Sequence, residues 1–311
     1  FFADEGYSMV YASAQKNPLI RFLDMGWIVF KNRTEVDYVI IDTYSTFSFW
    51  YAFMVSQLCR LFAIKYIPIL HGGNLPHRLD RNPVACKMLF HHSYKNVAPS
   101  GYLMDAFQKR NFPHLLFIPN TIHLGEYPYL AEREVSVPKL LWVRSFASLY
   151  HPKMAVDVLK GLQKHYPEAA LCMVGPEKDG SLAETKVYAN EQGVAVTFTG
   201  RLSRAAWVTL SKEYNVFINT TNFDNTPVSV LEAMCLGLPV VSTAVGGIPF
   251  LLKDKETALL TPAGDVDAMV AAVQTYIEDA KLRSEIITHS RHYVEGFDWE
   301  RVKLKWHAIL V

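Results

Sequence analysis

Short apolar runs alternate with amphipathic stretches along almost the whole chain. In the first half, the apolar runs predict strands at 8–13, 37–44, 66–70, 96–100 and 115–120. The intervening segments predict helices at about 17–31, 46–63, 82–92 and 100–110. Strands that alternate with helices of this length are typical of a parallel sheet. The pattern therefore predicts an α/β fold.

The second half repeats this alternation more regularly. Its apolar runs predict strands at 139–143, 171–175, 196–200, 215–220, 238–242 and 258–262. Helices are predicted after Pro152, at 181–192, after Ser203, after Pro227, after Gly247, and at 265–278 and 281–294. A last amphipathic helix should use one face for core contacts, with Trp299, Val302, Leu304 and Trp306 as candidates.

The length of the chain and the position of its prolines predict how it divides into domains. A chain of 311 residues is long for a single core, and two domains are the first expectation. The charged, proline-punctuated segment 125–138 predicts a linker between a domain at 1–124 and a domain at 139–295. We expect residues 296–311 to form a helix that packs back towards the N-terminal domain.

Composition narrows the classes of function. Half of the residues are hydrophobic and the formal net charge is +1, which gives no general case for nucleic-acid binding. The four cysteines are scattered in apolar surroundings without paired spacing, so we expect reduced, buried thiols. No DxD-type or His/Cys cluster that would hold a metal ion is present in the sequence.

Two apolar segments raise the question of membrane contact. The run 45–64 is the most hydrophobic, but its polar residues and Arg60 favour a buried crossover helix over a membrane span. Segment 17–31 is expected to pack on its own sheet, with contact to a lipid surface as the alternative. The chain starts with FFADEG, and we expect that about 20–40 residues, roughly one βα unit, are missing from this end.

The polar residues of interest follow predicted strands. His71, Asn120, Arg144, Gly175 and Gly200 each come directly after one, as do the loop 222–226 and the pair Gly246–Gly247. Two doubly wound domains place ligands at the carboxyl ends of their strands, in the cleft between the domains. These residues are therefore candidates for one binding cleft.

The stretch 219–247 carries the most specific pattern. Its loop leads into a helix for which Thr226 is predicted as the N-cap and Pro227 as the first helical residue. Free amides at such a helix start form an anion site. Asp224 precedes this helix, and Glu232 lies inside it among apolar residues.

The run FDNTPVSVLEAMCLGLPVVSTAVGGIP resembles the C-terminal signature of the retaining GT-B glycosyltransferases of family 4. The IPN run, an Arg after the first strand of the second domain and a His loop in the first domain occur in the family's order. The resemblance implies the GT-B fold, with two Rossmann-like domains facing across a cleft. It also implies retaining transfer of a hexose-type sugar from a nucleoside diphosphate to an acceptor hydroxyl, without a metal or other cofactor.

The resemblance also assigns residues. Glu232 would accept both ribose hydroxyls, Asp224 would contact the donor sugar, and Arg144 would pair with the diphosphate. Asp224 departs from the family, which has Glu there, and the family's Lys after Arg144 is replaced by Leu149 or Tyr150. The remaining donor-binding candidates are Asn225, Thr226, Val228, Ser229, Gly200, Arg201, Gly175 and, in place of the missing Lys, Lys153.

His71 matches the family's active-site His and would approach the sugar or the acceptor hydroxyl. The acceptor-side candidates beside it are Gly72, Gly73, Asn74 and Arg78. The partners implied are a nucleotide-sugar donor and a glycan or lipid-linked acceptor, with peripheral membrane contact and no nucleic acid. The protein would then lie in the cytoplasm or at the inner face of the cytoplasmic membrane.

Three other hypotheses remain open at this point. A GT-B-like sugar-nucleotide epimerase would use a similar cleft but should carry acid/base carboxylates next to the sugar. A protein that binds nucleotide sugar without turnover would fit the missing Lys. A scaffold role is disfavoured, because the polar residues gather after strands rather than on one outer surface.

Overall fold

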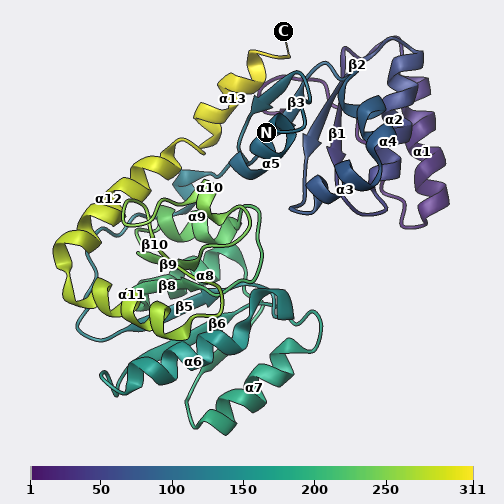
Figure 1. Ribbon diagram of the computed structural model, residues 1–311. Coiled ribbons are helices and arrows are strands. Elements are labelled where there is room, and N and C mark those ends of the chain that lie inside the picture. Colours follow the sequence, from purple (N-terminus) through teal and green to yellow (C-terminus); the bar gives the residue numbers. More distant parts are fainter. Residues whose placement is uncertain (1, 311) are drawn as a thin grey trace. The chain divides into compact units, whose positions relative to one another are not determined.

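The computed structural model describes residues 2–310 and consists of two compact α/β units (Figure 1). Unit 1 comprises residues 2–120 and 299–310, and unit 2 comprises residues 121–298. Residues 125–138, for which a linker is predicted, belong to unit 2, and residues 299–310 of the predicted final helix belong to unit 1.

Unit 1 is built on a four-stranded parallel sheet. Its strands are β1 (Tyr38–Thr43), β2 (Lys65–Leu70), β3 (Asn96–Ala98) and β4 (Leu115–Phe117), in that spatial order. Its helices are α1 (Pro18–Lys31), α2 (Phe49–Leu61), α3 (Leu75–Arg81), α4 (Pro83–Phe90), α5 (Gly101–Gln108) and α13 (Trp299–His307). Apolar side chains of α1, α2, α4 and α5 share one core with this sheet, in which α1 packs on α2, and side chains of α13 cover Ile67 and Val97.

Unit 2 is a six-stranded parallel sheet with helices on both faces. Its strands are β5 (Lys139–Val143), β6 (Ala170–Val174), β7 (Thr197–Gly200), β8 (Val216–Asn219), β9 (Val240–Thr243) and β10 (Leu259–Thr261). Its helices are α6 (Pro152–Gln163), α7 (Ser181–Gln192), α8 (Arg204–Leu210), α9 (Val228–Cys235), α10 (Ile248–Leu251), α11 (Val266–Glu278) and α12 (Ala280–Glu295). Short 3-10 turns are η1 (Leu124–Glu126), η2 (Ser148–Tyr150) and η3 (Ser211–Glu213).

The order of the unit-2 strands is β10-β9-β8-β5-β6-β7. Starting from β5, the chain builds outward to β7, then returns to β8 on the other side of β5 and builds outward to β10. This is the doubly wound topology, in which the winding direction reverses between the two central strands. The predicted α/β fold class is confirmed for both units.

Successive strand residues in unit 2 point to opposite cores. Leu141 and Phe217 are buried with α8, α9 and α10 on one face, whereas Leu140, Trp142 and Ile218 are buried with α6 and α11 on the other. A strand buried on both faces reads as a continuous apolar run. This explains why KLLWV and VFIN show no polar alternation.

In unit 1, two local predictions are wrong and one helix was missed. Residues 8–13 form no strand: Val10 and Tyr11 are exposed, and β1 pairs only with β2 among the described strands. Leu304 is 64% exposed, because α13 buries positions 299, 302 and 306, and 304 lies on the opposite side of that helical stripe. The loop after His71 also contains a helix, α3, which was not predicted.

Helix α2, within the apolar run 45–64, is an ordinary crossover between β1 and β2. Phe49, Ala52, Val55 and Cys59 of α2 are buried in the core of unit 1, as predicted for this segment. Within residues 2–310, no helix is both long enough and apolar enough to cross a membrane. In α1, by contrast, several large apolar side chains remain exposed, among them Leu19, Leu23 and Trp27.

Candidate functional site

The winding direction of unit 2 reverses between β5 and β8. Arg144 follows β5, and the segment 220–227 follows β8. In open α/β sheets, ligands bind beyond the carboxyl ends of the strands at such a reversal, because the two loops diverge and leave space there. The sequence places its strongest candidates on these two loops.

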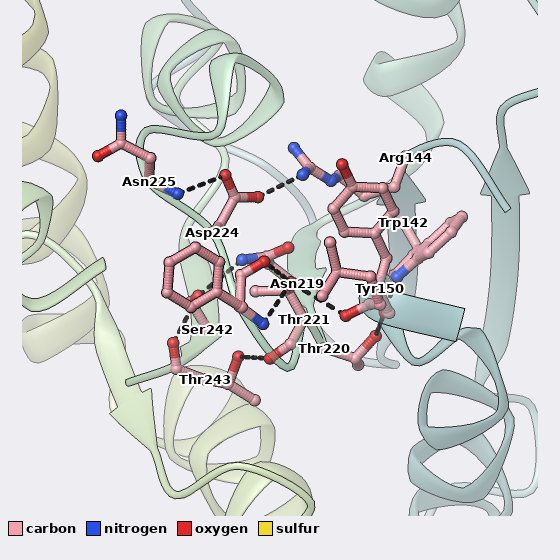
Figure 2. Close-up of polar contacts among 12 residues, drawn as sticks. Trp142, Arg144, Tyr150, Asn219, Thr220, Thr221, Asp224, Asn225, Ser242 and Thr243 are labelled. Carbon is pink, nitrogen blue, oxygen red and sulfur yellow. Dashed lines mark hydrogen bonds and ion pairs between the residues drawn. The ribbon is translucent and has the colours of Figure 1, made fainter. Parts of the chain in front are cut away.

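Arg144 and Asp224 form an ion pair across this reversal point, between Nη2 and Oδ2 (Figure 2). Their side chains are only 12% and 13% exposed. The guanidinium also lies over the ring of Tyr150, with 4.0 Å from Cζ to the ring centroid. Burial raises the pKa of Asp224, and the charge of Arg144 opposes that rise. The two residues for which separate roles are predicted are therefore direct partners.

A hydrogen-bonded layer fixes the segment that carries Asp224. The Trp142 indole donates to Thr220 Oγ1 at 3.1 Å, and Thr220 in turn donates to the carbonyl of Tyr150 at 2.9 Å (Figure 2). Thr243 at the end of β9 donates to the carbonyl of Thr221 at 2.6 Å. Because these contacts lock the loop from two neighbouring strands, Asp224 is held in place without help from a ligand.

The paired glycines after β9 have a steric reason. A Cβ on Gly246 would lie 2.3 Å from the carbonyl oxygen of Asp224, and one on Gly247 would lie 2.0 Å from that of Asn225. The Gly247 amide donates to the Asp224 carbonyl at 2.7 Å. The two glycines therefore let the Asp224 loop rest directly on the chain after β9.

The start of α9 differs from its prediction by one residue. Pro227 is the N-cap, with ψ 112°, and Val228 is the first helical residue, so Thr226 does not cap the helix. The hydroxyls of Thr226 and Ser229 are buried without a hydrogen-bond partner, as is Nε of Arg144. Buried polar groups are nearly always paired. Three unpaired ones together indicate a place for a polar ligand.

A pocket of about 510 Å³ opens among these groups. Its charged lining residues are three arginines, Arg144, Arg201 and Arg204, and one carboxylate, Asp224. The rest of the lining is Val143, Ser145, Tyr150, Val174, Gly175, Pro176, Leu202, Trp207, Thr226, Pro227, Val228 and Ser229. The excess of positive charge, together with the amides at the start of α9, suits an anionic ligand.

Several predicted donor residues meet in this pocket. Arg144, Gly175, Arg201, Asp224, Thr226, Val228 and Ser229 all line it. Gly175 also has a structural role, because a Cβ there would lie 1.7 Å from the Arg144 carbonyl oxygen. Gly200 and Asn225 are neighbours in sequence of lining residues but are not themselves part of the lining.

Glu232 lies one turn beyond Ser229 in α9 and is 9% exposed. Its Oε1 accepts a hydrogen bond from the Tyr127 hydroxyl at 2.5 Å and lies 3.8 Å from Nε of Arg204. Burial raises the pKa of this carboxyl, and the Tyr127 hydrogen bond and the Arg204 charge partly offset the rise. Glu232 does not line the pocket itself, but its neighbour Arg204 does.

Lys153 is not brought to the pocket. Its Nζ pairs with Glu184 of α7 at 2.9 Å, and its side chain is 42% exposed. At the two positions where the resemblance predicts a lysine the chain has Leu149 and Tyr150, and the ring of Tyr150 packs on Arg144. The structure thus offers Arg204 as a further cation at the pocket, a residue that sequence reasoning missed because it belongs to no matched motif.

Unit 1 carries the His71 candidate. His71 follows β2, and its Nε2 lies 2.9 Å from Oδ1 of Asp42, at the end of β1. Its ring stacks on Tyr44, with 5.0 Å between centroids. The hydrogen bond from His71 lowers the pKa of Asp42. Neither Asp42 nor Tyr44 was singled out from the sequence, although both lie at the end of the strand predicted at 37–44.

The predicted acceptor-side residues lie beside His71. Gly72 has φ +85°, in the left-handed region, and Gly73 and Asn74 lead into α3. Arg78 donates to the carbonyl of Ser45 at 2.5 and 3.0 Å and to Asn82. Its guanidinium therefore holds the loop after β1, a structural contact that the sequence did not suggest.

Metal-ligating side chains do not gather in the described part of the chain. Within residues 2–310, no group of three or more His, Cys, Asp or Glu side chains gathers as a metal site would. The cysteines Cys59, Cys86, Cys172 and Cys235 are free and buried, as predicted. Burial raises the pKa of Cys59, Cys86 and Cys235 to about 12, which keeps these thiols protonated and unreactive.

Comparison with known proteins places this geometry in a family. The model of the family "Glycosyl transferases group 1" matches residues 132–293, which is most of unit 2. The sulfoquinovosyl transferase SQD2 of Arabidopsis thaliana is 32% identical over 159 residues, 49% of this chain and 29% of the plant protein. The chain spans less than half of the length of the curated relatives that it matches.

Solved structures extend the likeness to both units. A sucrose-phosphate synthase from Thermosynechococcus elongatus superposes with a TM-score of 0.77 at 18% identity, over 97% of this chain and 80% of that one. Anabaena HepE, crystallised with UDP, gives 0.79 at 16% identity, over 94% and 84%. At such identities the likeness concerns the fold alone, which is that of the GT-B glycosyltransferases.

Proposed function

The chain belongs to the glycosyl transferases group 1 family, and we propose that it transfers a sugar from a nucleoside-diphosphate sugar to an acceptor hydroxyl. The observation that carries the proposal is the pocket at the reversal point of unit 2, with its three arginines and three unpaired buried polar atoms. A diphosphate supplies the negative charge and the oxygen acceptors that these groups lack. The crystallisation of HepE with UDP supports the same class of ligand.

Arg144 is the proposed diphosphate ligand. Its Nη2 is engaged by Asp224, whereas its Nε is buried and unpaired. A phosphate oxygen that accepts from Nε satisfies this group without breaking the Asp224 pair. As the bond between the sugar and the diphosphate breaks, negative charge grows on the leaving phosphate, and a fixed guanidinium stabilises that charge without reorganisation.

The start of α9 is the second proposed phosphate contact. The hydroxyls of Thr226 and Ser229 have no partner, and the amides of the first helical turn add the positive end of the helix dipole. With Arg144 they surround one anion from two loops. Asp224, fixed by the Asn225 amide at 2.9 Å, is left to contact hydroxyls of the donor sugar.

We infer a retaining, front-face reaction. The bond from the sugar's anomeric carbon to the diphosphate oxygen breaks, and the acceptor oxygen bonds to the same face of that carbon. The acceptor proton passes to the departing phosphate oxygen. No group of this chain needs to form a covalent intermediate, and His71 is proposed to bind the sugar or the acceptor hydroxyl through its ring nitrogen.

The acceptor is proposed to be a glycan or a lipid-linked saccharide, with peripheral contact to a membrane. The observation that supports membrane contact is the exposure of Leu19, Leu23 and Trp27 on α1, beside Arg21 and Lys31. Apolar side chains flanked by basic ones suit an anionic lipid surface. Co-sedimentation with anionic and with neutral vesicles tests this point.

Two experiments test the proposal, first for donor binding and then for sugar transfer. Thermal unfolding with UDP, GDP, ADP and CMP identifies the nucleotide, because a ligand that binds the folded state raises its stability. Labelled sugar donor is then supplied with and without a lipid-extract acceptor. Transfer to the extract is the expected result, whereas conversion to another nucleotide sugar indicates an epimerase. Binding without any turnover indicates a non-catalytic binding protein, and absence of binding overturns the proposal.

A further inference from the structure

Four side chains form a connected network behind the pocket: Glu126, Tyr127, Arg204 and Glu232. Tyr127 donates to Glu232 Oε1 at 2.5 Å, and Nε of Arg204 lies 3.8 Å from the same oxygen. Nη1 of Arg204 pairs with Glu126 Oε2. Glu126 and Tyr127 lie at the end of the η1 turn, Arg204 in the first turn of α8 and Glu232 in the middle of α9. Tyr127 and Arg204 converge on one carboxylate oxygen of Glu232.

We propose that Tyr127 and Arg204 are positioning residues that hold the Glu232 carboxylate ready to bind a vicinal diol, as a ribose presents. The inference rests on the proposed function and on the family resemblance, which assigns Glu232 to the donor ribose. Both partners approach Oε1, and within residues 2–310 no hydrogen bond reaches Oε2. The Glu232 side chain keeps 12% of its surface exposed. One oxygen is therefore fixed while the other stays available.

The network offsets the effect of burial on the protonation of Glu232. A diol donates two hydrogen bonds, and an ionised carboxylate accepts both, whereas a protonated one has lost part of its acceptor capacity. Glu232 is buried, which favours the protonated form. The Tyr127 hydroxyl and the Arg204 guanidinium both favour the ionised form, against burial and against the nearby charge of Glu126. They thus preserve the state that binds a diol.

The other elements around Glu232 contribute little charge to this balance. On α9 itself, the nearby titratable group is the Cys235 thiol, whose pKa burial raises to about 12. From α12, Arg291 directs Nη1 to the Cys235 carbonyl at 2.8 Å and Nε to Glu295. Tyr127 is 3% exposed, so its hydroxyl has little access to water as an alternative partner.

The test compares a ribonucleotide with its 2′-deoxy analogue, which lacks one hydroxyl of the diol. Affinities for UDP and 2′-deoxy-UDP, or for the base that the nucleotide panel selects, are measured by calorimetry between pH 5 and pH 8. For the wild-type protein we expect a preference of about tenfold or more for the ribose form at neutral pH. The preference should decline as the pH falls and Glu232 becomes protonated.

Two variants should change this preference specifically. In Tyr127→Phe the lost hydrogen bond raises the pKa of Glu232, so the decline should begin at higher pH and the neutral preference should drop at least about threefold. Affinity for the deoxy form should stay close to wild type. Arg204→Gln should lower the ribose preference in the same direction but less, because its side chain is 56% exposed and lies farther away. Because Arg204 also lines the pocket, this variant should in addition weaken the binding of both nucleotides.

The matched control is Tyr166→Phe. It removes another tyrosine–glutamate hydrogen bond of unit 2, from Tyr166 to Glu278 at 3.1 Å, on residues that do not line the pocket. It should leave the preference and its pH profile unchanged. Equal loss for both nucleotides in Tyr127→Phe and Arg204→Gln, or a wild-type profile in both, overturns the positioning role alone. A wild-type protein that binds no nucleoside diphosphate overturns the proposed function as well.

Discussion

Two side-chain pairs at the carboxyl ends of strands, Arg144–Asp224 in unit 2 and His71–Asp42 in unit 1, join a basic residue to a carboxylate, and their environments differ. Arg144 and Asp224 in unit 2 are 12% and 13% exposed, whereas in the pair of His71 and Asp42 in unit 1 the side chains are 23% and 64% exposed. The partner is a cation in one case and a titratable imidazole in the other. The resulting pKa shifts have opposite directions: Asp224 is raised and Asp42 is lowered.

The contrast shows that a close basic partner does not by itself decide in which direction the pKa of a carboxyl group shifts. At Asp224, the loss of hydration outweighs the attraction of Arg144. At Asp42, a side chain that is 64% exposed keeps most of its hydration, so the hydrogen bond from His71 dominates. A buried pair is shielded from water and its two side chains have little room to move. This suits a fixed electrostatic role. An exposed pair can exchange partners, which suits contact with a varying acceptor.

Breaking the buried pair should have the largest effect. Arg144→Ala removes the proposed diphosphate ligand and leaves a buried carboxylate unpaired. We expect turnover to fall by about 10²–10³-fold, the usual result of removing a fixed charge-stabilising donor. The free energy of unfolding should fall by about 3 kcal/mol or somewhat less, because both side chains retain some exposure. Steady-state kinetics and denaturant unfolding measure the two effects.

Arg144→Lys is the matched control for this loss. A lysine keeps the charge but offers no second donor in the position of the unpaired Nε. We therefore expect stability near that of wild type together with turnover that is still reduced at least about tenfold. Wild-type turnover in Arg144→Ala would contradict the diphosphate role.

The exposed pair is the next comparison. His71→Ala should reduce transfer by about 10²-fold, the lower end of the range typical of a positioned proton-transfer group. Its effect on the free energy of unfolding should stay below about 1 kcal/mol, because exposed pairs contribute little. Asp42→Asn is the control for loss of the pair alone. If His71→Ala and Asp42→Asn reduce transfer equally, the imidazole has no role of its own.

The fold and the positions of the main site residues could be predicted from the sequence. The alternation of apolar runs predicts both parallel sheets, and the position of Arg144, Asp224 and His71 after strands follows from that. The signature around Glu232 predicts the family. Local periodicity also explains the failures: it gives no warning that residues 8–13 lack a neighbouring strand, or that Leu304 lies outside the stripe that α13 buries.

The side chains that pair with the site residues could not be predicted from the sequence. The pairing of Arg144 with Asp224 joins residues 80 positions apart, and that of Tyr127 with Glu232 joins residues 105 apart. Such contacts depend on which strands become neighbours, which periodicity does not reveal. Arg204 was missed for the same reason, since a lone arginine at a helix start resembles any exposed charge until Glu232 lies beside it.

A smaller effect follows from neutralising the buried carboxylate. Asp224→Asn keeps the shape of the loop and releases Arg144 from its ion pair, so the nucleoside diphosphate alone should bind up to about tenfold more tightly. Transfer should fall by a similar factor, because an amide is a weaker acceptor for the sugar hydroxyls. Calorimetry with the nucleotide and transfer kinetics separate the two changes.

The same variant tests the pKa contrast through stability. Because the folded pKa of Asp224 is raised, its contribution is complete below the unfolded value of about 3.9 and is lost as the pH rises through the folded pKa. Wild-type protein should therefore lose stability relative to Asp224→Asn as the pH rises from about 4. The lowered pKa of Asp42 has the opposite sign, so its contribution fades only as the pH falls below about 3.9. A parallel pH dependence of wild type and both Asn variants would refute the contrast.

Lys153→Ala should have the smallest effect. The sequence assigns Lys153 to the donor, but its ammonium pairs with Glu184 on the outside of α6 and α7 and does not line the pocket. A partly exposed pair of this kind contributes about 0.2–1 kcal/mol to stability. We expect nucleotide affinity and turnover within about twofold of wild type, measured beside Glu184→Ala, which breaks the same pair from the other side. A much larger loss in Lys153→Ala alone would mean that the lysine leaves Glu184 when the donor binds. Lys153 would then supply the second cation that neither Leu149 nor Tyr150 supplies.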